Sequence, residues 1–211
     1  MIDNKIQEYA ESHTTPESPV LYDLNRQTHI KVLRPRMLSG HLQGEFLKMF
    51  SGLVKPRRIL EVGTYTGYST ICLAEGLQEG GKLITLEKNV ELIDFAQEYF
   101  KKSGYDNNIE LVVGDALDTL HEVEGGFDLV FIDANKKDYS KYYDIIIEKV
   151  NKGGYILADN VLWSGKVVDE GADKDADTIA IKAFNKKVHD DPRTENMLLT
   201  LRDGILIIKK L

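Results

Sequence analysis

Short apolar runs separated by longer amphipathic stretches make up most of this chain. The runs are rich in branched aliphatic residues and lie at 59–62, 82–87, 109–113, 128–132 and 155–158. Runs of this length predict buried strands, and the stretches between them, which end in glycines, predict helices. Strands that alternate with helices predict an α/β fold with a mostly parallel sheet and helices on both faces.

The predicted helices are delimited by capping residues and glycines. One covers residues 69–77 and stops at a pair of glycines. Asn89 starts a second, which ends with Gly104, and a third passes through residues 142–143 and is closed by Gly153 and Gly154,.

Both ends of the chain depart from this alternation. At the C-terminal end, residues 197–201 and 205–208 are strand-like and are joined by Arg-Asp-Gly at 202–204, which predicts an antiparallel hairpin,. At the N-terminal end, a short helix is predicted at residues 2–13, and two prolines in residues 14–19 interrupt it. Ser39 is the predicted N-cap of a further helix, whose apolar residues have helical spacing: Leu42, Phe46, Met49, Phe50 and Leu53,.

The composition favours one cytoplasmic domain over residues 1–211. No internal repeat or linker divides the chain, and the 42% hydrophobic and 29% charged residues are ordinary for a globular protein,. The net charge of -7 disfavours broad binding to nucleic acids or anionic membranes,. A single cysteine, Cys72, suits a reducing compartment,. The sequence shows no apolar run near 20 residues and no signal-peptide pattern, which fits this expectation,.

The turn after the first strand suggests a ligand. Residues 61–69 (Glu-Val-Gly-Thr-Tyr-Thr-Gly-Tyr-Ser) lead from a strand into a helix, where α/β proteins bind nucleotides,. Only Gly63 and Gly67 flank the turn, and the bulky Tyr65 argues against a pyrophosphate on this loop,. Glu87 ends the next strand, as expected of a ribose-binding acid,. These features favour a nucleoside without phosphates, such as S-adenosylmethionine (SAM), and a turn without a ligand is the alternative.

Polar side chains occur at the ends of five strands: Glu61, Glu87, Asp115, Asp133, and Asp159 with Asn160. The carboxyl ends of parallel strands share one edge of the sheet, so this recurrence argues against a mere helix cap at each of them. Asp133, Asp159 and Asn160 are hard oxygen donors, which favour Mg²⁺ or a similar ion over zinc. Lys136 is a candidate general base, with a solvated lysine as the alternative. Residues 168–177 are predicted as an acidic surface loop.

With these motifs the chain resembles the cation-dependent, SAM-dependent O-methyltransferases of the caffeoyl-CoA and catechol type, most closely their small bacterial members. The resemblance implies a Rossmann-like SAM-methyltransferase fold with a seven-stranded sheet, and a homodimer in which residues 1–36 shape the substrate entrance. It rests on residues 37–47, 60–69, 114–116, 131–136, 158–165, 191–195 and 202–204.

The resemblance also implies roles for individual residues. Lys136 would be the catalytic base beside Asp133, and Mg²⁺ or Mn²⁺ would be bound by Asp133, Asp159 and Asn160. Glu87 would bind the ribose of SAM, and Ala116 with its neighbours would bind the adenine. The full set of SAM-binding residues would be Ser39, Glu61, Gly63, Thr64, Ser69, Glu87, Asp115, Ala116 and Asp133.

The predicted reaction is metal-dependent transfer of a methyl group from SAM to a hydroxyl of a small aromatic vicinal diol, such as a catechol or caffeoyl group. One alternative is methylation of 5-hydroxyuridine in transfer RNA, for which the basic residues Lys31, Arg34 and Arg36 are available. A SAM-binding protein without catalysis is another alternative, disfavoured by the complete set of metal ligands and by Lys136. No membrane partner is expected.

Overall fold

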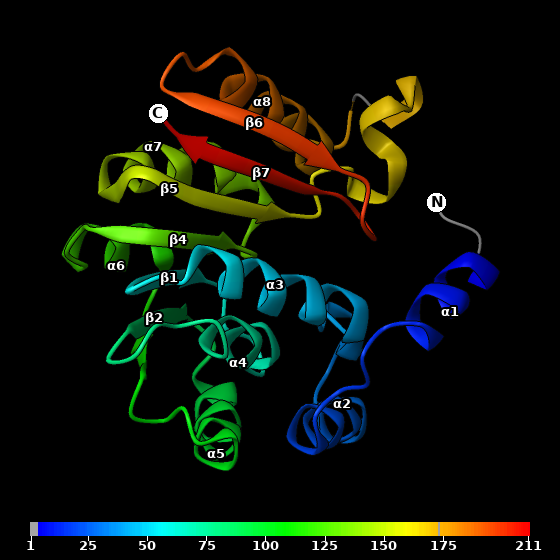
Figure 1. Cartoon of the computed structure of the whole chain (residues 1–211). Coiled ribbons are helices and arrows are strands. Elements are labelled where there is room, and N and C mark those ends of the chain that lie inside the picture. The colour runs from blue at the N-terminus through cyan, green and yellow to red at the C-terminus, as the bar shows by residue number, and fades with distance from the viewer. Residues whose placement is uncertain (1–3, 173) are drawn as a thin grey trace.

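A computed structural model describes residues 4–172 and 174–211 of the chain. Seven strands form one sheet in the order β3-β2-β1-β4-β5-β7-β6 (Figure 1). The first five strands pair in parallel, and β7 is antiparallel to both β5 and β6, as predicted. The strands are β1 (Arg58–Val62), β2 (Lys82–Glu87), β3 (Ile109–Val113), β4 (Phe127–Ile132), β5 (Val150–Asp159), β6 (Thr194–Leu199) and β7 (Ile205–Lys210).

Helices cover both faces of the sheet and enclose two hydrophobic layers (Figure 1). Side chains of β4 alternate between the layers, with Leu129 and Phe131 in one and Val130 and Ile132 in the other,. The first layer is covered by α2 (Pro19–Lys31), α3 (His41–Val54), α4 (Tyr68–Ala74) and α5 (Ile93–Ser103). The second is covered by α6 (Ala116–Glu122), α7 (Tyr139–Lys149) and α8 (Ala176–Asp190).

The remaining described helices are short or lie near the N-terminus. Helix α1 (Asn4–Ser12) confirms the predicted N-terminal helix over its described part, and residues 1–3 lie outside the described range. The 3-10 helices are η1 (Pro35–Met37), η2 (Val90–Leu92), η3 (Lys136–Asp138), η4 (Trp163–Val168) and η5 (Glu170–Ala172). The predicted loop at 168–177 therefore contains helical turns and the start of α8, and its Asp173 lies outside the described residues. Among residues 4–172 and 174–211, no helix is long and apolar enough to cross a membrane.

Helix α2 was not predicted, because Pro19 was interpreted as an interruption. The structure shows that Pro19 opens the helix, and that the Ser18 side chain caps it by accepting a hydrogen bond from the Leu21 main-chain nitrogen. A proline in the first turn is compatible with a helix, since its missing N–H would have no intrahelical partner there. The capping serine followed by proline was therefore a start signal.

Several boundaries differ from the predicted ones. Gly153 and Gly154 lie inside β5 and do not close α7, which ends at Lys149. The β4–β5 register shifts here, and Gly153 has φ 81°, so the glycines form an irregularity that a side chain would strain,. Helix α4 ends at Ala74 and β6 covers residues 194–199, not 197–201. Strand β1 begins one residue earlier than predicted, at Arg58, and ends at Val62 as predicted.

The predicted cap of α3 is wrong. The helix begins at His41 and its N-cap is Gly40, which makes no side-chain capping bond. Gly40 has φ 76° and ψ 175°, a conformation that favours glycine, so the N-cap lies one residue beyond Ser39,. The main-chain oxygen of Ser39 instead accepts a hydrogen bond from Arg202.

The apolar stripe of α3 is not its most buried face. Met49 and Leu53 are 62% and 82% exposed, whereas the buried residues are Gln43, Gly44, Leu47 and Ser51. Small residues face α4 because the two helices approach closely: a Cβ on Gly44 would lie 2.5 Å from the ring of Tyr68. Ser51 donates a hydrogen bond of 2.8 Å to the Leu73 main-chain oxygen on α4.

Candidate active site

The glycine turn lies against the end of β4. Gly63 has φ 103°, and a Cβ at this position would collide with the main-chain oxygen of Asp133. Gly67 has φ 88°, and its Cβ would lie 2.6 Å from the ring of Phe100 on α5. Both positions therefore require glycine, because both have a positive φ and both pack closely against other groups,. This proximity joins the predicted SAM-binding turn to the predicted metal ligands.

Glu61 lies completely buried beneath the turn and is surrounded by hydroxyl groups. It accepts hydrogen bonds from Ser69 Oγ (2.6 Å), Thr70 Oγ1 (2.5 Å) and Thr85 Oγ1 (2.6 Å). The Thr64 hydroxyl lies 2.5 Å from that of Thr85 and extends the network. Burial raises the pKa of Glu61 to about 7, although the three hydroxyl donors oppose this effect,. Through its two carboxylate oxygens Glu61 thus joins β1 to the first residues of α4 and to β2.

Glu87 and Asp115 differ in their surroundings. The Glu87 carboxylate is half-buried at the end of β2 and accepts main-chain hydrogen bonds from Tyr65 (2.7 Å) and Asn89 (2.8 Å). It is therefore oriented at the carboxyl edge, where a ribose would lie. Asp115 is exposed and caps α6 by accepting a bond of 3.0 Å from the Leu117 nitrogen, and Ala116 is the first residue of that helix. At Asp115 the structure shows the helix cap that a single acid after a strand suggests.

The predicted metal ligands come together at the ends of β4 and β5. Ile132 pairs with Ala158, so Asp133 and Asp159 follow at neighbouring positions. Asp159 is 2% exposed, and burial together with the negative charge of Asp133 raises its pKa to about 6,. The three predicted ligands comprise two carboxylates and the amide of Asn160. Within the described parts of the chain, no group of three His, Cys, Asp or Glu side chains forms a metal cluster.

Lys136 is buried against Asp133, so the solvated lysine considered as an alternative is wrong. Its Nζ donates hydrogen bonds to Asp133 Oδ1 (2.7 Å) and to the Tyr139 hydroxyl (2.6 Å). The Tyr139 hydroxyl lies 3.1 Å from the main-chain oxygens of both Ile132 and Asp159, to which it can donate. Burial raises the pKa of Tyr139 well above its usual range, so this neutral hydroxyl can accept a bond from the lysine,.

The N-terminal segment reaches the same edge of the sheet. The Tyr65 hydroxyl donates to the main-chain oxygens of Leu33 (3.1 Å) and Arg34 (3.2 Å). Farther along the turn, Thr28 of α2 donates to the Thr66 hydroxyl at 3.2 Å. The bulky Tyr65, which had argued only against a pyrophosphate, therefore anchors residues preceding α3 to the turn.

Three residues near the site were missed by sequence reasoning: Gln43, Tyr139 and Arg202. Gln43 Nε2 donates to Asp159 Oδ2 at 2.8 Å, and Arg202 Nη1 donates to Gln43 Oε1 at 2.9 Å. Tyr139 follows Lys136 by three residues, a spacing that places side chains on one helical face and was available as a signal,. No local pattern indicated the partners of Gln43 and Arg202.

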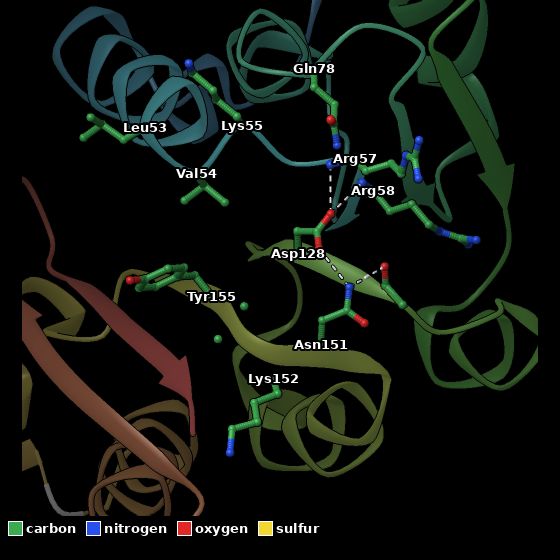
Figure 2. Close-up of a pocket in the computed structure, with 13 residues that line it drawn as sticks. Leu53, Val54, Lys55, Arg57, Arg58, Gln78, Asp128, Asn151, Lys152 and Tyr155 are labelled. Carbon is green, nitrogen blue, oxygen red and sulfur yellow. Dashed lines mark hydrogen bonds between the residues drawn. The ribbon is translucent and has the colours of Figure 1, made fainter.

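A cavity of about 610 Å³ lies at the other end of the parallel strands (Figure 2). At its centre Asp128 accepts hydrogen bonds from the main-chain nitrogens of Arg57 (2.8 Å) and Arg58 (3.2 Å) and from Asn151 Nδ2 (2.8 Å). These contacts give Asp128 a structural role between β1, β4 and β5. None of the predicted site residues lines this cavity, so the candidate active site is the carboxyl edge.

Comparisons with known proteins find similar sequences and structures over most of the chain. A family model described as O-methyltransferase matches residues 10–211. The chain is 34% identical to caffeoyl-CoA O-methyltransferase of Medicago sativa over 80% of this chain and 73% of that protein. It is 41% identical to catechol O-methyltransferase of Mycobacterium tuberculosis (strain ATCC 25618 / H37Rv) over 67% of this chain and 65% of that protein. A solved O-methyltransferase from Bacillus cereus in complex with SAH has a TM-score of 0.91 at 28% identity, covering 98% of this chain and 97% of that one.

Proposed function

The chain belongs to the O-methyltransferase family, and from this membership we propose that it methylates one hydroxyl of a small aromatic vicinal diol with the help of a divalent cation. As a family member it is a SAM-dependent O-methyltransferase. The observation that carries the proposal is the meeting of Asp133, Asp159 and the buried Lys136 at the ends of adjacent strands. Catechol and caffeoyl groups, the acceptors in the names of two relatives, both carry adjacent hydroxyls.

The proposed SAM site follows the carboxyl edge from the glycine turn to α6. Glu87 would bind the ribose hydroxyls, because its carboxylate is oriented by two main-chain N–H groups. Gly63, Thr64 and Ser69 would border the methionine end, and Glu61 would act by holding Ser69 in place. The predicted contributions of Ser39, Asp115, Ala116 and Asp133 remain proposals of the same kind.

The donor set fits a hard divalent cation such as Mg²⁺ or Mn²⁺. Asp133 and Asp159 would supply negative charge and Asn160 an amide oxygen, which are ligands that such ions prefer. The two adjacent oxygens of the diol would chelate the bound cation, whose charge would lower the pKa of the hydroxyl to be methylated.

Lys136 is the proposed base. In the structure its Nζ is held between Asp133 and Tyr139. In its neutral form it would accept the proton of the acceptor hydroxyl. The acceptor oxygen then forms a bond to the methyl carbon while the bond from that carbon to the SAM sulfur breaks, which leaves SAH. Holding both reactants in line contributes much of the rate acceleration.

The proposal is tested by labelled-methyl transfer to catechol and to resorcinol, whose hydroxyls are not adjacent. We expect methylation of catechol alone, loss of activity in EDTA, and recovery with Mg²⁺ or Mn²⁺. Asp133→Ala and Asp159→Ala should be nearly inactive, whereas Asp118→Ala, an exposed residue of α6, should be active. Equal turnover of both phenols would contradict the diol requirement, and full activity in EDTA would contradict the metal requirement. The relatives described above give no support to the transfer-RNA alternative.

We also propose that the protein is a homodimer. The apolar stripe of α3 leaves Met49 and Leu53 largely exposed, and Met197 on the edge strand β6 is 56% exposed. Met197 pairs with Ile207, which packs into the α3 side of the core, so these side chains belong to the same face of the sheet. Large apolar side chains exposed on this face favour an interface between subunits. A cytoplasmic location remains a prediction.

A further inference from the structure

Asp159 is connected to Arg202 through a buried glutamine. Arg202 Nη1 donates to Gln43 Oε1 (2.9 Å), and Gln43 Nε2 donates to Asp159 Oδ2 (2.8 Å). We refer to these three residues as the Gln43 relay. Gln43 is completely buried on α3, and it lies 116 residues from Asp159 and 159 residues from Arg202 in the chain. The relay therefore joins α3, the end of β5 and the turn between β6 and β7.

Arg202 determines which way the Gln43 amide faces. A guanidinium group has only hydrogen-bond donors, so the carbonyl oxygen of Gln43 must point toward it. The amide nitrogen then points toward Asp159, whose carboxylate can only accept. The other carboxylate oxygen, Oδ1, accepts a bond of 2.7 Å from the Asn160 main-chain nitrogen. Rotation of the carboxylate is thus restrained at both oxygens.

Arg202 is itself held in place by the segment that precedes α3. Its Nη1 also donates to the main-chain oxygen of Ser39, and its Nη2 donates to that of Leu38 at 3.3 Å. These bonds leave the guanidinium few other orientations. Arg202 is an exposed residue, but these bonds anchor its guanidinium, so the direction of the Gln43 amide is set by the tertiary structure.

We propose that Gln43 is a positioning residue that orients Asp159 toward a divalent cation, and that Arg202 acts through Gln43. This inference rests on the proposed metal dependence. A carboxylate fixed by hydrogen bonds presents its remaining lone pairs in one direction, so it binds a cation more tightly than a freely rotating carboxylate. Loss of such a partner typically weakens metal binding about 10- to 100-fold, and we expect a loss of that size in Gln43→Met.

The test is calorimetric titration with Mn²⁺ in the absence of SAM and acceptor. Methionine has nearly the volume of glutamine and no amide, so Gln43→Met removes one link of the relay with little change in packing. Arg202→Met removes the other link at an exposed residue, together with the bonds to Ser39 and Leu38. Both variants should bind Mn²⁺ more weakly, and the double variant should bind no more weakly than Gln43→Met. The control Gln78→Met changes an exposed glutamine at the opposite edge of the sheet and should bind like the wild type.

The outcomes separate this inference from the function on which it rests. A wild-type protein that binds no Mn²⁺ would contradict the proposed metal dependence itself. If the wild type binds Mn²⁺ and folded Gln43→Met, judged by thermal unfolding, binds it equally well, the positioning role is overturned. If Gln43→Met does not fold, Arg202→Met, at an exposed residue, decides, and wild-type affinity in that variant overturns the proposal. Additive losses in the double variant would show that Arg202 does not act through Gln43.

Discussion

Replacing Glu61 with glutamine should change how the free energy of unfolding depends on pH. Glu61 is completely buried, and its pKa is raised from an ordinary 4.5 to about 7, chiefly by burial. Because the folded state binds the proton more tightly than the unfolded state, the stabilising contribution of protonated Glu61 is complete below pH 4.5,. It is lost as the pH rises toward 7 and stays constant at higher pH. Glutamine remains neutral at every pH, so the stability of Glu61→Gln does not include this pH-dependent loss.

The magnitude follows from the two pKa values. One pKa unit corresponds to about 1.4 kcal/mol, and a shift from 4.5 to about 7 changes the stability difference between wild type and Glu61→Gln by about 2.5 kcal/mol between pH 5 and pH 8,. The free energy of unfolding of Glu61→Gln should therefore rise relative to that of the wild type between pH 5 and pH 8. Asp159 also has a raised pKa, but it contributes equally to both proteins, and its effect cancels in their difference.

The assay is urea unfolding followed by circular dichroism at pH 5, 6, 7 and 8 without SAM. Wild type, Glu61→Gln and the control Glu79→Gln, which changes an exposed glutamate, are compared at each pH. The free energy of unfolding of Glu61→Gln should rise steadily relative to that of the wild type up to about pH 7. The corresponding difference between Glu79→Gln and the wild type should not change with pH. A Glu61→Gln difference that is the same at pH 5 and pH 8 would refute the reasoning, because it would mean that Glu61 is already ionised in the folded protein.

Two further predictions concern cofactor binding and assembly. If Glu87 binds the ribose, Glu87→Ala loses charge-assisted hydrogen bonds worth roughly 1.5–3 kcal/mol each, and SAM affinity measured by calorimetry should fall at least about tenfold. The exposed Glu91→Ala should bind SAM normally, and unchanged affinity in folded Glu87→Ala would place the ribose elsewhere. If the apolar stripe of α3 is a dimer interface, Leu53→Glu should be a monomer by light scattering, since it buries a charge there. Val90→Glu, at another exposed apolar position, should leave the dimer intact, and a dimeric Leu53→Glu would exclude this stripe as the interface.

The order and type of the strands were predictable because the signals are local. A buried strand such as residues 128–132 needs apolar side chains on both faces, and this requirement produces an apolar run in the sequence,. The C-terminal hairpin was likewise encoded by a short turn sequence between two apolar segments. The predicted boundaries of helices and strands were wrong where a residue type is compatible with two different local structures. Pro19 can interrupt a helix or open one, and Gly153 can follow a helix or form an irregularity in a strand.

The position of the candidate site was also determined by the sequence, through topology. Parallel strands place their carboxyl ends at one edge, so acids at strand ends were expected to converge, and Asp133 and Asp159 do so,. The sequence could not show what each acid contacts. Asp115 caps α6, Glu61 is enclosed by hydroxyls, and Asp133 pairs with Lys136. These surroundings depend on side chains that several elements supply.

Only the tertiary structure decided which polar residues pair with the buried Gln43. Gln43 lies on a helix whose apolar stripe suggested a different inward face, and Arg202 is an exposed residue of a hairpin turn, where no local pattern indicates a partner. Each is satisfied by a partner more than a hundred residues away. A buried polar group must find its hydrogen bonds wherever the chain brings a matching partner, so no periodicity records it. Apolar burial leaves a pattern along the sequence, whereas the pairing of buried polar groups exists only in the folded chain.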